Sequence, residues 1–334
     1  MKKAINILII FSLILILNTI PLLAFADDDM IVSTFAGEGL LFNMPYSVFS
    51  GNDGELYVID TYNNSIRLLD EAGNLVQTIG GELSGHLDGP FEYALFDRPT
   101  GGVMDNEGRI FVVDSGNHAI RMLYNGYVYT LTGGEAGGRN GHLSYARFNR
   151  PSAITIDRNG NLYVVDTLNH AIRFINLTTG NVSTLAGRLG QEGYRDSIRM
   201  QALFSNPMGI TISPDGRRIY IADTGNHIVR VLEGMRVETV AEGFLLPMDL
   251  LWHNNLLMVA DTGNHLISAV SRYGEVMMVA GTGYPGTENG IALESEFHFP
   301  RAIYNWNGRL LIVDSGNNMI RILDIGLGHS PVWE

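Results

Sequence analysis

Residues 162–176 read LYVVDTLNHAIRFIN, and five other stretches of the chain repeat this pattern. Each copy has an apolar run that ends in Asp, followed by Thr or Ser, any residue, Asn, and His or Asn. The six aspartates are Asp60, Asp114, Asp166, Asp223, Asp261 and Asp314. Similarity that recurs at a period of about 50 residues is typical of proteins built from stacked or circular repeats.

Each copy lies within a unit that reads as four short strands. A strand led by a proline comes first, the apolar run to the Asp is second, a strand with the pattern Ile-Arg-x-Leu is third, and a strand rich in Val and Thr is fourth. The second strand is apolar on both of its alternating faces, as a sheet packed between two other sheets requires. These units predict an all-β protein, a six-bladed β-propeller.

The two ends of the repeat region predict how the ring closes. Ile31 begins IVSTFAGEG, which matches a fourth strand, whereas the last copy has three strands that end at Asp324 and no fourth. We therefore expect the N-terminal strand to complete the last blade, so that no sheet edge stays open at the seam. The predicted domains are a signal peptide at 1–26, the propeller at 27–324 and a short tail at 325–334.

The first 26 residues have the features of a secretory signal. Lys2 and Lys3 precede an apolar stretch over 4–17, and Ala24-Phe25-Ala26 supplies a small-x-small cleavage pattern. We expect cleavage after Ala26 and a secreted or extracytoplasmic protein. The alternative is an uncleaved segment that anchors the protein to a membrane.

Composition excludes several classes of protein. The 334 residues include no Cys, are 46% hydrophobic and only 17% charged, and carry a formal charge of −13. A disordered chain would be more charged and less apolar, and disulfides cannot stabilise this one. The acidic excess argues against binding to nucleic acid or to an anionic membrane surface. We expect the protein to be a monomer. We expect its partner to be a protein or an extracellular polymer.

The repeat resembles the NHL repeat, and Asn264-His265-Leu266 spells the motif that gives that family its name. The resemblance covers residues 30–324. It implies a six-bladed propeller in which the first strand of each blade lines a central channel. It implies no particular reaction.

The recurrent charged residues are expected to be structural. The Asp carboxylates would accept N–H groups of the turn that follows, and the Asn three residues later suits a left-handed turn position. An arginine stands seven residues after five of the aspartates: Arg67, Arg121, Arg173, Arg230 and Arg321. We expect these arginines to bond one blade to the next. Ser268 replaces the arginine in the fifth copy, which predicts the weakest junction there.

Four histidines share one position of the turn: His118, His170, His227 and His265. They invite a metal site, but the first and last copies carry Asn64 and Asn318 there, and turns on separate blades lie too far apart for one zinc ion. The sequence therefore does not establish whether the protein binds a metal ion. No cofactor is expected, with calcium left open because acidic oxygens are plentiful.

Departures from the repeat are better candidates for function. The residue after each strand-leading proline should point into the channel mouth, which makes a predicted ligand-binding set of Tyr46, Thr100, Ser152, Met208, Met248 and Arg301. Arg301 would contact a carboxylate or sulfate group, or else form an internal salt bridge with Glu294 or Glu296. No residue is assigned a catalytic role.

Long connections lead into four of the prolines and are expected to wall the channel face over blades two, three, four and six. Each carries a Phe that should anchor it: Phe96, Phe148, Phe204 and Phe297. The variable residues between are candidate contacts, because loops on a rigid scaffold often carry recognition. They are His86, Asp88, Arg139, His142, Tyr194, Arg195 and Glu288.

These observations favour an exported, non-catalytic binding scaffold. The alternative is a propeller enzyme, a metal-dependent lyase or a hydrolase, with its site at the channel mouth. Peptide-amidating lyases resemble NHL proteins but hold zinc through histidines, and none of the six mouth positions is His. The chain also has no G-x-S-x-G elbow of the kind that acyl-transfer enzymes use.

Overall fold

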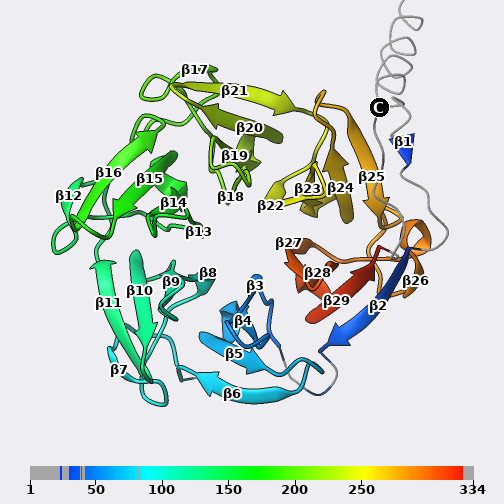
Figure 1. Ribbon diagram of the computed structural model, residues 1–334, viewed down its shortest axis with the longest axis horizontal. Coiled ribbons are helices and arrows are strands. Elements are labelled where there is room, and N and C mark those ends of the chain that lie inside the picture. Colours follow the sequence, from blue (N-terminus) through cyan, green and yellow to red (C-terminus); the bar gives the residue numbers. More distant parts are fainter. Residues whose placement is uncertain (1–22, 25–29, 38, 40–41, 82, 326–334) are drawn as a thin grey trace, which may run out of the picture.

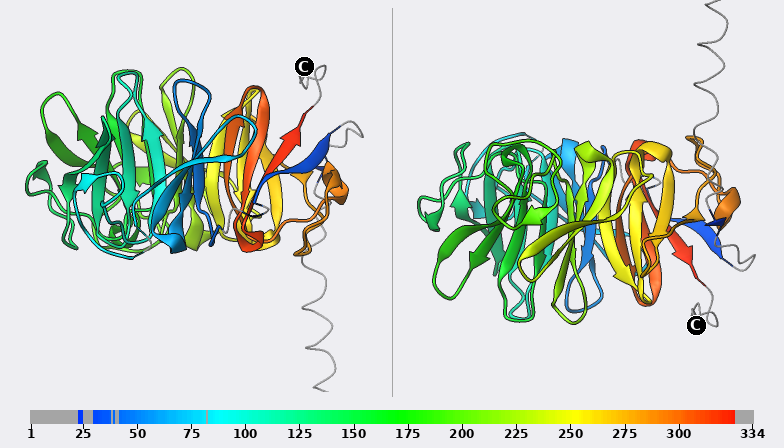
Figure 2. Two further views of the ribbon diagram at one scale, coloured as in Figure 1. Left: turned by 90° about the horizontal axis from the view of Figure 1, so that it is seen from below. Right: turned by 90° about the horizontal axis from the view of Figure 1, so that it is seen from above.

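The computed structural model describes residues 23–24, 30–37, 39, 42–81 and 83–325. Six sheets stand side by side in a ring, each running from the centre to the rim (Figure 1). Seen from the side, the ring is a thick disc (Figure 2). Most of the predicted signal peptide, and 326–334 of the predicted tail, lie outside the described residues.

Each blade contains the four antiparallel strands that the repeat predicts. The blades are numbered one to six in the order of their repeat aspartates. The first, innermost strands are β3 (Ser47–Ser50), β8 (Pro99–Met104), β13 (Ala153–Ile156), β18 (Gly209–Ile212), β22 (Pro247–His253) and β27 (Pro300–Trp306). The second strands are β4 (Leu56–Asp60), β9 (Ile110–Asp114), β14 (Leu162–Asp166), β19 (Arg218–Asp223), β23 (Leu256–Asp261) and β28 (Arg309–Asp314).

The outer half of each blade follows the repeat Asp. In five blades a short 3-10 helix leads to the third strand: η1 (Thr61–Asn63), η2 (Thr167–Asn169), η3 (Thr224–Asn226), η4 (Thr262–Asn264) and η6 (Ser315–Asn317). The third strands are β5 (Ser65–Leu69), β10 (Ala119–Tyr124), β15 (Ala171–Asn176), β20 (Ile228–Glu233), β24 (Leu266–Val270) and β29 (Met319–Asp324). The fourth strands are β6 (Leu75–Ile79), β11 (Tyr127–Gly133), β16 (Asn181–Ala186), β21 (Arg236–Ala241), β25 (Val276–Ala280) and β2 (Ile31–Ala36).

The ring closes as predicted. β2, the N-terminal strand, pairs antiparallel with β29, with Ile31 opposite Asp324 and Ala36 opposite Ile320. β2 therefore serves as the fourth strand of the last blade (Figure 1). Val32 of this strand is fully buried, so the seam is part of the core.

The long connections do not wall the channel face as expected. Each instead adds a fifth strand of two residues to the outer edge of its blade: β7 (Gly89–Pro90), β12 (Gly141–His142), β17 (Ser197–Ile198) and β26 (Gly290–Ile291). The last connection also contains η5 (Ala292–Glu294). In blade five, β1 (Leu23–Ala24) pairs parallel with β25 at the same edge. The long connections lie at the outer edges because an unpaired fourth strand exposes backbone N–H and C=O groups. A short strand from the connection forms hydrogen bonds with these groups.

The core lies between neighbouring blades. All five residues of β9 are buried, as expected for a strand that contacts a sheet on each face. One apolar cluster joins Ile59 and Ile66 of blade one to Ile110 and Val112 of blade two. Within the described residues, no helix has the length and apolar character that crossing a membrane would need.

Candidate functional site

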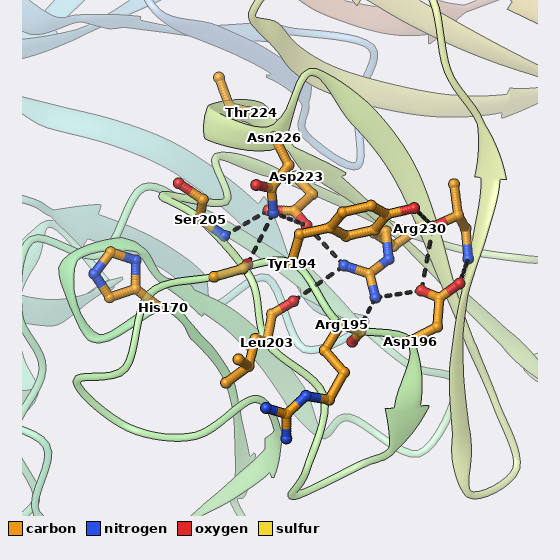
Figure 3. Close-up of polar contacts among 12 residues, drawn as sticks. His170, Tyr194, Arg195, Asp196, Leu203, Ser205, Asp223, Thr224, Asn226 and Arg230 are labelled. Carbon is orange, nitrogen blue, oxygen red and sulfur yellow. Dashed lines mark hydrogen bonds and ion pairs between the residues drawn. The ribbon is translucent and has the colours of Figure 1, made fainter.

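The repeat aspartates are structural anchors, as blade four illustrates (Figure 3). Asp223 Oδ1 accepts the backbone N–H of Ser205 at 2.8 Å, which fixes the end of the incoming connection. Its Oδ2 accepts Asn226 Nδ2 at 2.9 Å and Arg230 Nη1 at 2.8 Å. The carboxylate therefore joins the connection, the turn and the third strand.

Two details of the predicted turn were wrong. The donor to Oδ1 comes from the preceding connection and not from the turn, and this holds in all six blades. The left-handed residue is the one after the Asn, as at His227 with φ of 60°. The Asn is needed where it stands because its side-chain amide reaches back to the Asp.

The expected blade-to-blade role of the arginines was also wrong. Arg230 Nη1 donates to Leu203 O at 3.1 Å, and Nη2 donates to Arg195 O at 3.0 Å and to Asp196 Oδ1 at 2.5 Å (Figure 3). These acceptors belong to the connection whose short strand extends the same blade. Arg121, Arg173 and Arg321 make equivalent bonds and are fully buried. The guanidinium donors thus hold a connection to its own blade. This set of hydrogen bonds from the arginine to the connection is the clamp.

The anchoring Phe residues are confirmed, whereas some expected contact residues are part of the clamp. Phe204 is fully buried, with the Arg230 guanidinium carbon 5.2 Å from its ring centroid, and the other three long connections repeat this contact. Asp88, predicted as a free contact, instead accepts Arg121 Nη2 at 2.7 Å and the Thr130 N–H at 2.9 Å. Its carboxylate is committed to the fold.

The turn histidines lie at the blade junctions. His118 Nδ1 accepts the N–H of Arg150 in the next blade at 3.0 Å, and Asn64 Oδ1 accepts the N–H of Arg98 in the same way. All six junctions have this bond, because His Nδ1 and Asn Oδ1 can each accept one backbone proton. A common acceptor role explains why Asn and His alternate here. Within the described residues, no three His, Cys, Asp or Glu side chains gather where they could hold a metal ion.

The six predicted mouth residues do come together. Tyr46, Thr100, Ser152, Met208, Met248 and Arg301 all line one cavity of about 50 Å³ at the start of the innermost strands. Ser152 is committed to the fold because its Oγ donates to Met208 O at 2.8 Å. Whether this set binds a ligand stays a prediction.

Arg301 is the unusual residue of this cavity. Its guanidinium carbon lies 5.1 Å from the centroid of the Tyr46 ring, and Arg301 forms no ion pair with any described residue, Glu294 and Glu296 included. Arg301 Nε, Tyr46 Oη and Thr100 Oγ1 are buried and have no hydrogen-bond partner among the described residues. Burial raises the pKa of Tyr46 to about 12, so its hydroxyl stays protonated as a donor. The mouth thus offers several unused donors.

Asp249 also lines this cavity, although it was not predicted from the sequence. Its Oδ2 accepts the N–H of Ile303 at 3.0 Å, and desolvation by the surrounding strands raises the pKa of the Asp249 carboxyl to about 7. A signal was present, because the second residue after the proline is small in the other five blades: Ser47, Gly101, Ala153, Gly209 and Ala302.

A wider groove of about 610 Å³ lies between blades two and three, at the opposite ends of their inner strands. Its carboxylates are occupied locally. Asp105 Oδ2 accepts Arg109 Nε at 2.7 Å, and Asp157 Oδ2 accepts Asn161 Nδ2 at 3.0 Å. These two aspartates therefore form hydrogen bonds within their own turns.

Two segments of the chain, 148–173 and 204–232, match the family model of the NHL repeat. The chain is an NHL-repeat β-propeller. NHL repeat-containing protein 2 of Bos taurus is 34% identical over 160 residues, which are 44% of this chain and 22% of that protein. Teneurin-4 of Mus musculus is 25% identical over 338 residues, 84% of this chain and 12% of that protein. The chain therefore spans a minor part of the length of these relatives.

Solved structures share the propeller at low identity. An auxiliary nutrient binding protein from Bacteroides ovatus has a TM-score of 0.67 at 15% identity, covering 89% of this chain and 77% of that one. A gluconolactonase from Xanthomonas campestris has a TM-score of 0.63 at 14% identity, covering 90% and 96%. A streptogramin B lyase has a TM-score of 0.59 at 13% identity, covering 89% and 98%. The likeness concerns the fold alone.

Proposed function

We propose that this NHL propeller is an exported, non-catalytic binding scaffold whose channel mouth receives a carboxylate or sulfate group of a protein or an extracellular polymer. The observation that carries the proposal is Arg301, a cation without an ion-pair partner among the described residues, in a chain of formal charge −13. Tyr46 Oη and Thr100 Oγ1 supply neutral donors beside it. Charge and donors together suit an anionic group.

The size of the cavity supports recognition of a group carried by a larger partner. Pockets that enclose a small-molecule ligand usually measure about 300–1,000 Å³. This cavity, about 50 Å³, admits a terminal group and a few waters. The rest of the partner would lie across the end of the ring. The secreted location rests on the sequence of residues 1–26.

Binding to defined anionic polymers tests the proposal. The purified protein is titrated with a polyuronate, a sulfated polysaccharide and an acidic protein. Arg301→Gln should weaken the best of these interactions about tenfold, which corresponds to losing one charge-assisted hydrogen bond. Arg158→Gln is the matched control, because Arg158 is exposed at the opposite groove. Loss of binding in the Arg158 variant, with none in the Arg301 variant, would place the site on the other face.

A hydrolase or lyase is the second candidate function, and the raised pKa of the Asp249 carboxyl at the channel mouth favours it. A carboxyl with a pKa of about 7 is suited to donate or accept a proton near neutral pH. Turnover of a panel of lactones and esters, abolished by Asp249→Asn without a change in melting temperature, would support the enzyme. Absence of turnover, together with binding that depends on Arg301, would support the scaffold.

A further inference from the structure

Blade one has the arginine and the threonine that hold a connection in other blades, but among the described residues no connection bonds to them. Its incoming segment is short, and among the described residues β6 has no strand on its outer edge, so the sheet order is β3-β4-β5-β6. Arg67 and Thr78 nevertheless occupy the positions at which the four blades with long connections have an arginine and a threonine.

The four filled blades define what such an edge binds. A side chain of Asp or Asn from the connection accepts a bond from the arginine Nη2: Asp88, Asn140, Asp196 and Asn289, at 2.5–2.8 Å. Each also contacts the hydroxyl of the fourth-strand threonine. The carbonyl of the preceding residue takes a second bond from Nη2, and the Gly or Ser that follows pairs with the fourth strand.

Arg67 lacks this set of acceptors. With the described residues its side chain makes two hydrogen bonds, from Nε to Asp60 Oδ2 at 3.1 Å and from Nη1 to Thr78 Oγ1 at 3.0 Å. The Arg67 side chain is 17% exposed, whereas its counterpart Arg121 is fully buried. Its Nη2 therefore has no acceptor among the described residues.

Apolar exposure coincides with the missing strand. In blade two, Val128 of β11 pairs with Leu123 of the third strand on one side and with Gly89 of the fifth strand on the other. Its side chain is 0% exposed. In blade one, Leu75 stands opposite Leu69 and is 41% exposed, and its neighbour Val76 is 56% exposed. The register shifts beside Leu69, and such a bulge limits indiscriminate pairing of an edge.

A blade with a short connection does not by itself require an arginine and a threonine at the positions of Arg67 and Thr78, as blade five shows. Its connection is also short, yet it carries Ser268 and Met278 at these two positions. Blade one, by contrast, has both polar side chains and the open edge together.

We propose that the outer edge of blade one binds an extended segment of a partner protein that carries Asp or Asn followed by Gly or Ser. The segment adds an antiparallel strand to β6, and its Asp or Asn bonds Arg67 Nη2 and Thr78. Phe42 already fills the anchor position of the connection at 5% exposure, so the partner need not supply that ring. The partner is a different protein, because the described connections of this chain that have the motif are bound to their own blades.

A peptide taken from the chain provides the probe. The fluorescein-labelled sequence GHLDGPFEYA, residues 85–94, is titrated against the purified protein by fluorescence anisotropy. Alanine at the position of Asp88 in the peptide, or Arg67→Ser in the protein, should weaken binding about tenfold or more, since each removes a bond to a charged group. Ser268→Ala in blade five is the control and should bind like the wild type.

Folding is checked before binding is compared. Arg67→Ser copies the residue that blade five tolerates, and Thr78→Met, which copies Met278, leaves the Arg67–Asp60 pair in place and should also weaken binding. Equal binding by the wild type and both folded variants would overturn the proposal. So would the absence of binding at about 1 mM peptide, a concentration well above that at which such a strand should dock.

Discussion

Blades four and five share the four strands and the turn after the repeat Asp, but they differ at a buried position of the third strand and in the length of the incoming connection. Arg230 in blade four satisfies Asp223, two loop carbonyls and Asp196, whereas Ser268 in blade five is fully buried with no partner for its Oγ among the described residues. Asp261 of blade five keeps the bonds from Leu245 and Asn264. The blade itself therefore does not require the arginine, and the guanidinium serves to hold a long connection.

The pKa values of the two aspartates reflect this difference. Burial raises the pKa of both carboxyls, and in blade four the hydrogen bonds and the charge of Arg230 oppose the rise. In blade five no arginine opposes it, and the pKa of Asp261 reaches about 6. Desolvation without an opposing arginine therefore leaves the Asp261 carboxyl largely protonated at mildly acidic pH.

The largest expected effect comes from giving blade four the residue of blade five. Arg230→Ser should lower the free energy of unfolding by about 3–5 kcal/mol, because it leaves Asp223 as an unpaired buried charge. Urea unfolding followed by circular dichroism measures the change. Arg67→Ser in blade one is the matched variant and should lose clearly less, because Arg67 is partly exposed and holds no connection. Equal losses would contradict the clamp.

Asp261 should give the protein a specific pH dependence. Its folded pKa of about 6 exceeds the ordinary 3.8, so protonation of Asp261 favours the folded chain. This stability is fully present below about pH 3.8 and is lost as the pH rises through 6. The difference in unfolding free energy between wild type and Asp261→Asn should therefore fall by about 2–3 kcal/mol between about pH 4 and about pH 8. A constant difference would mean that Asp261 titrates normally.

Each junction histidine should give a smaller effect than Asp261, and of opposite sign. Burial lowers the pKa of His118, His170 and His265, and each must keep Nδ1 unprotonated to accept its bond. Their contribution is therefore present above about pH 6.5 and is lost as the pH falls below it. The triple His→Asn variant keeps an acceptor at every pH, as Asn64 and Asn318 do. Relative to this variant the wild type should lose about 1 kcal/mol per junction on acidification, measured by thermal unfolding. Parallel pH profiles of the two proteins would rule out a titrating junction.

The ring was predictable because its signals repeat. Six copies of one pattern indicated the blades, and the unmatched segments at Ile31 and Asp324 indicated the seam. The residues after the prolines converge on the mouth for the same reason, since equivalent positions of a ring face one axis.

The fifth strands and the clamp escaped prediction because two-residue strands have no periodicity and the acceptors are mostly backbone carbonyls. One signal could have been used. Each long connection has Asp or Asn eight residues before its anchoring Phe, as from Asp88 to Phe96. Asp249 was missed because it is a single departure from a small residue and has no counterpart in the other blades.

Hydrogen exchange of the fourth strands tests whether long connections cover the outer edges of four blades while the edge of blade one stays open. Mass spectrometry of the native protein would compare peptides that cover β6 with peptides that cover β11, β16 and β21. Exchange should be markedly faster over 75–79 than over the other three strands, because backbone groups on an unpaired edge meet solvent. Equal protection of β6 and the covered strands would contradict this expectation.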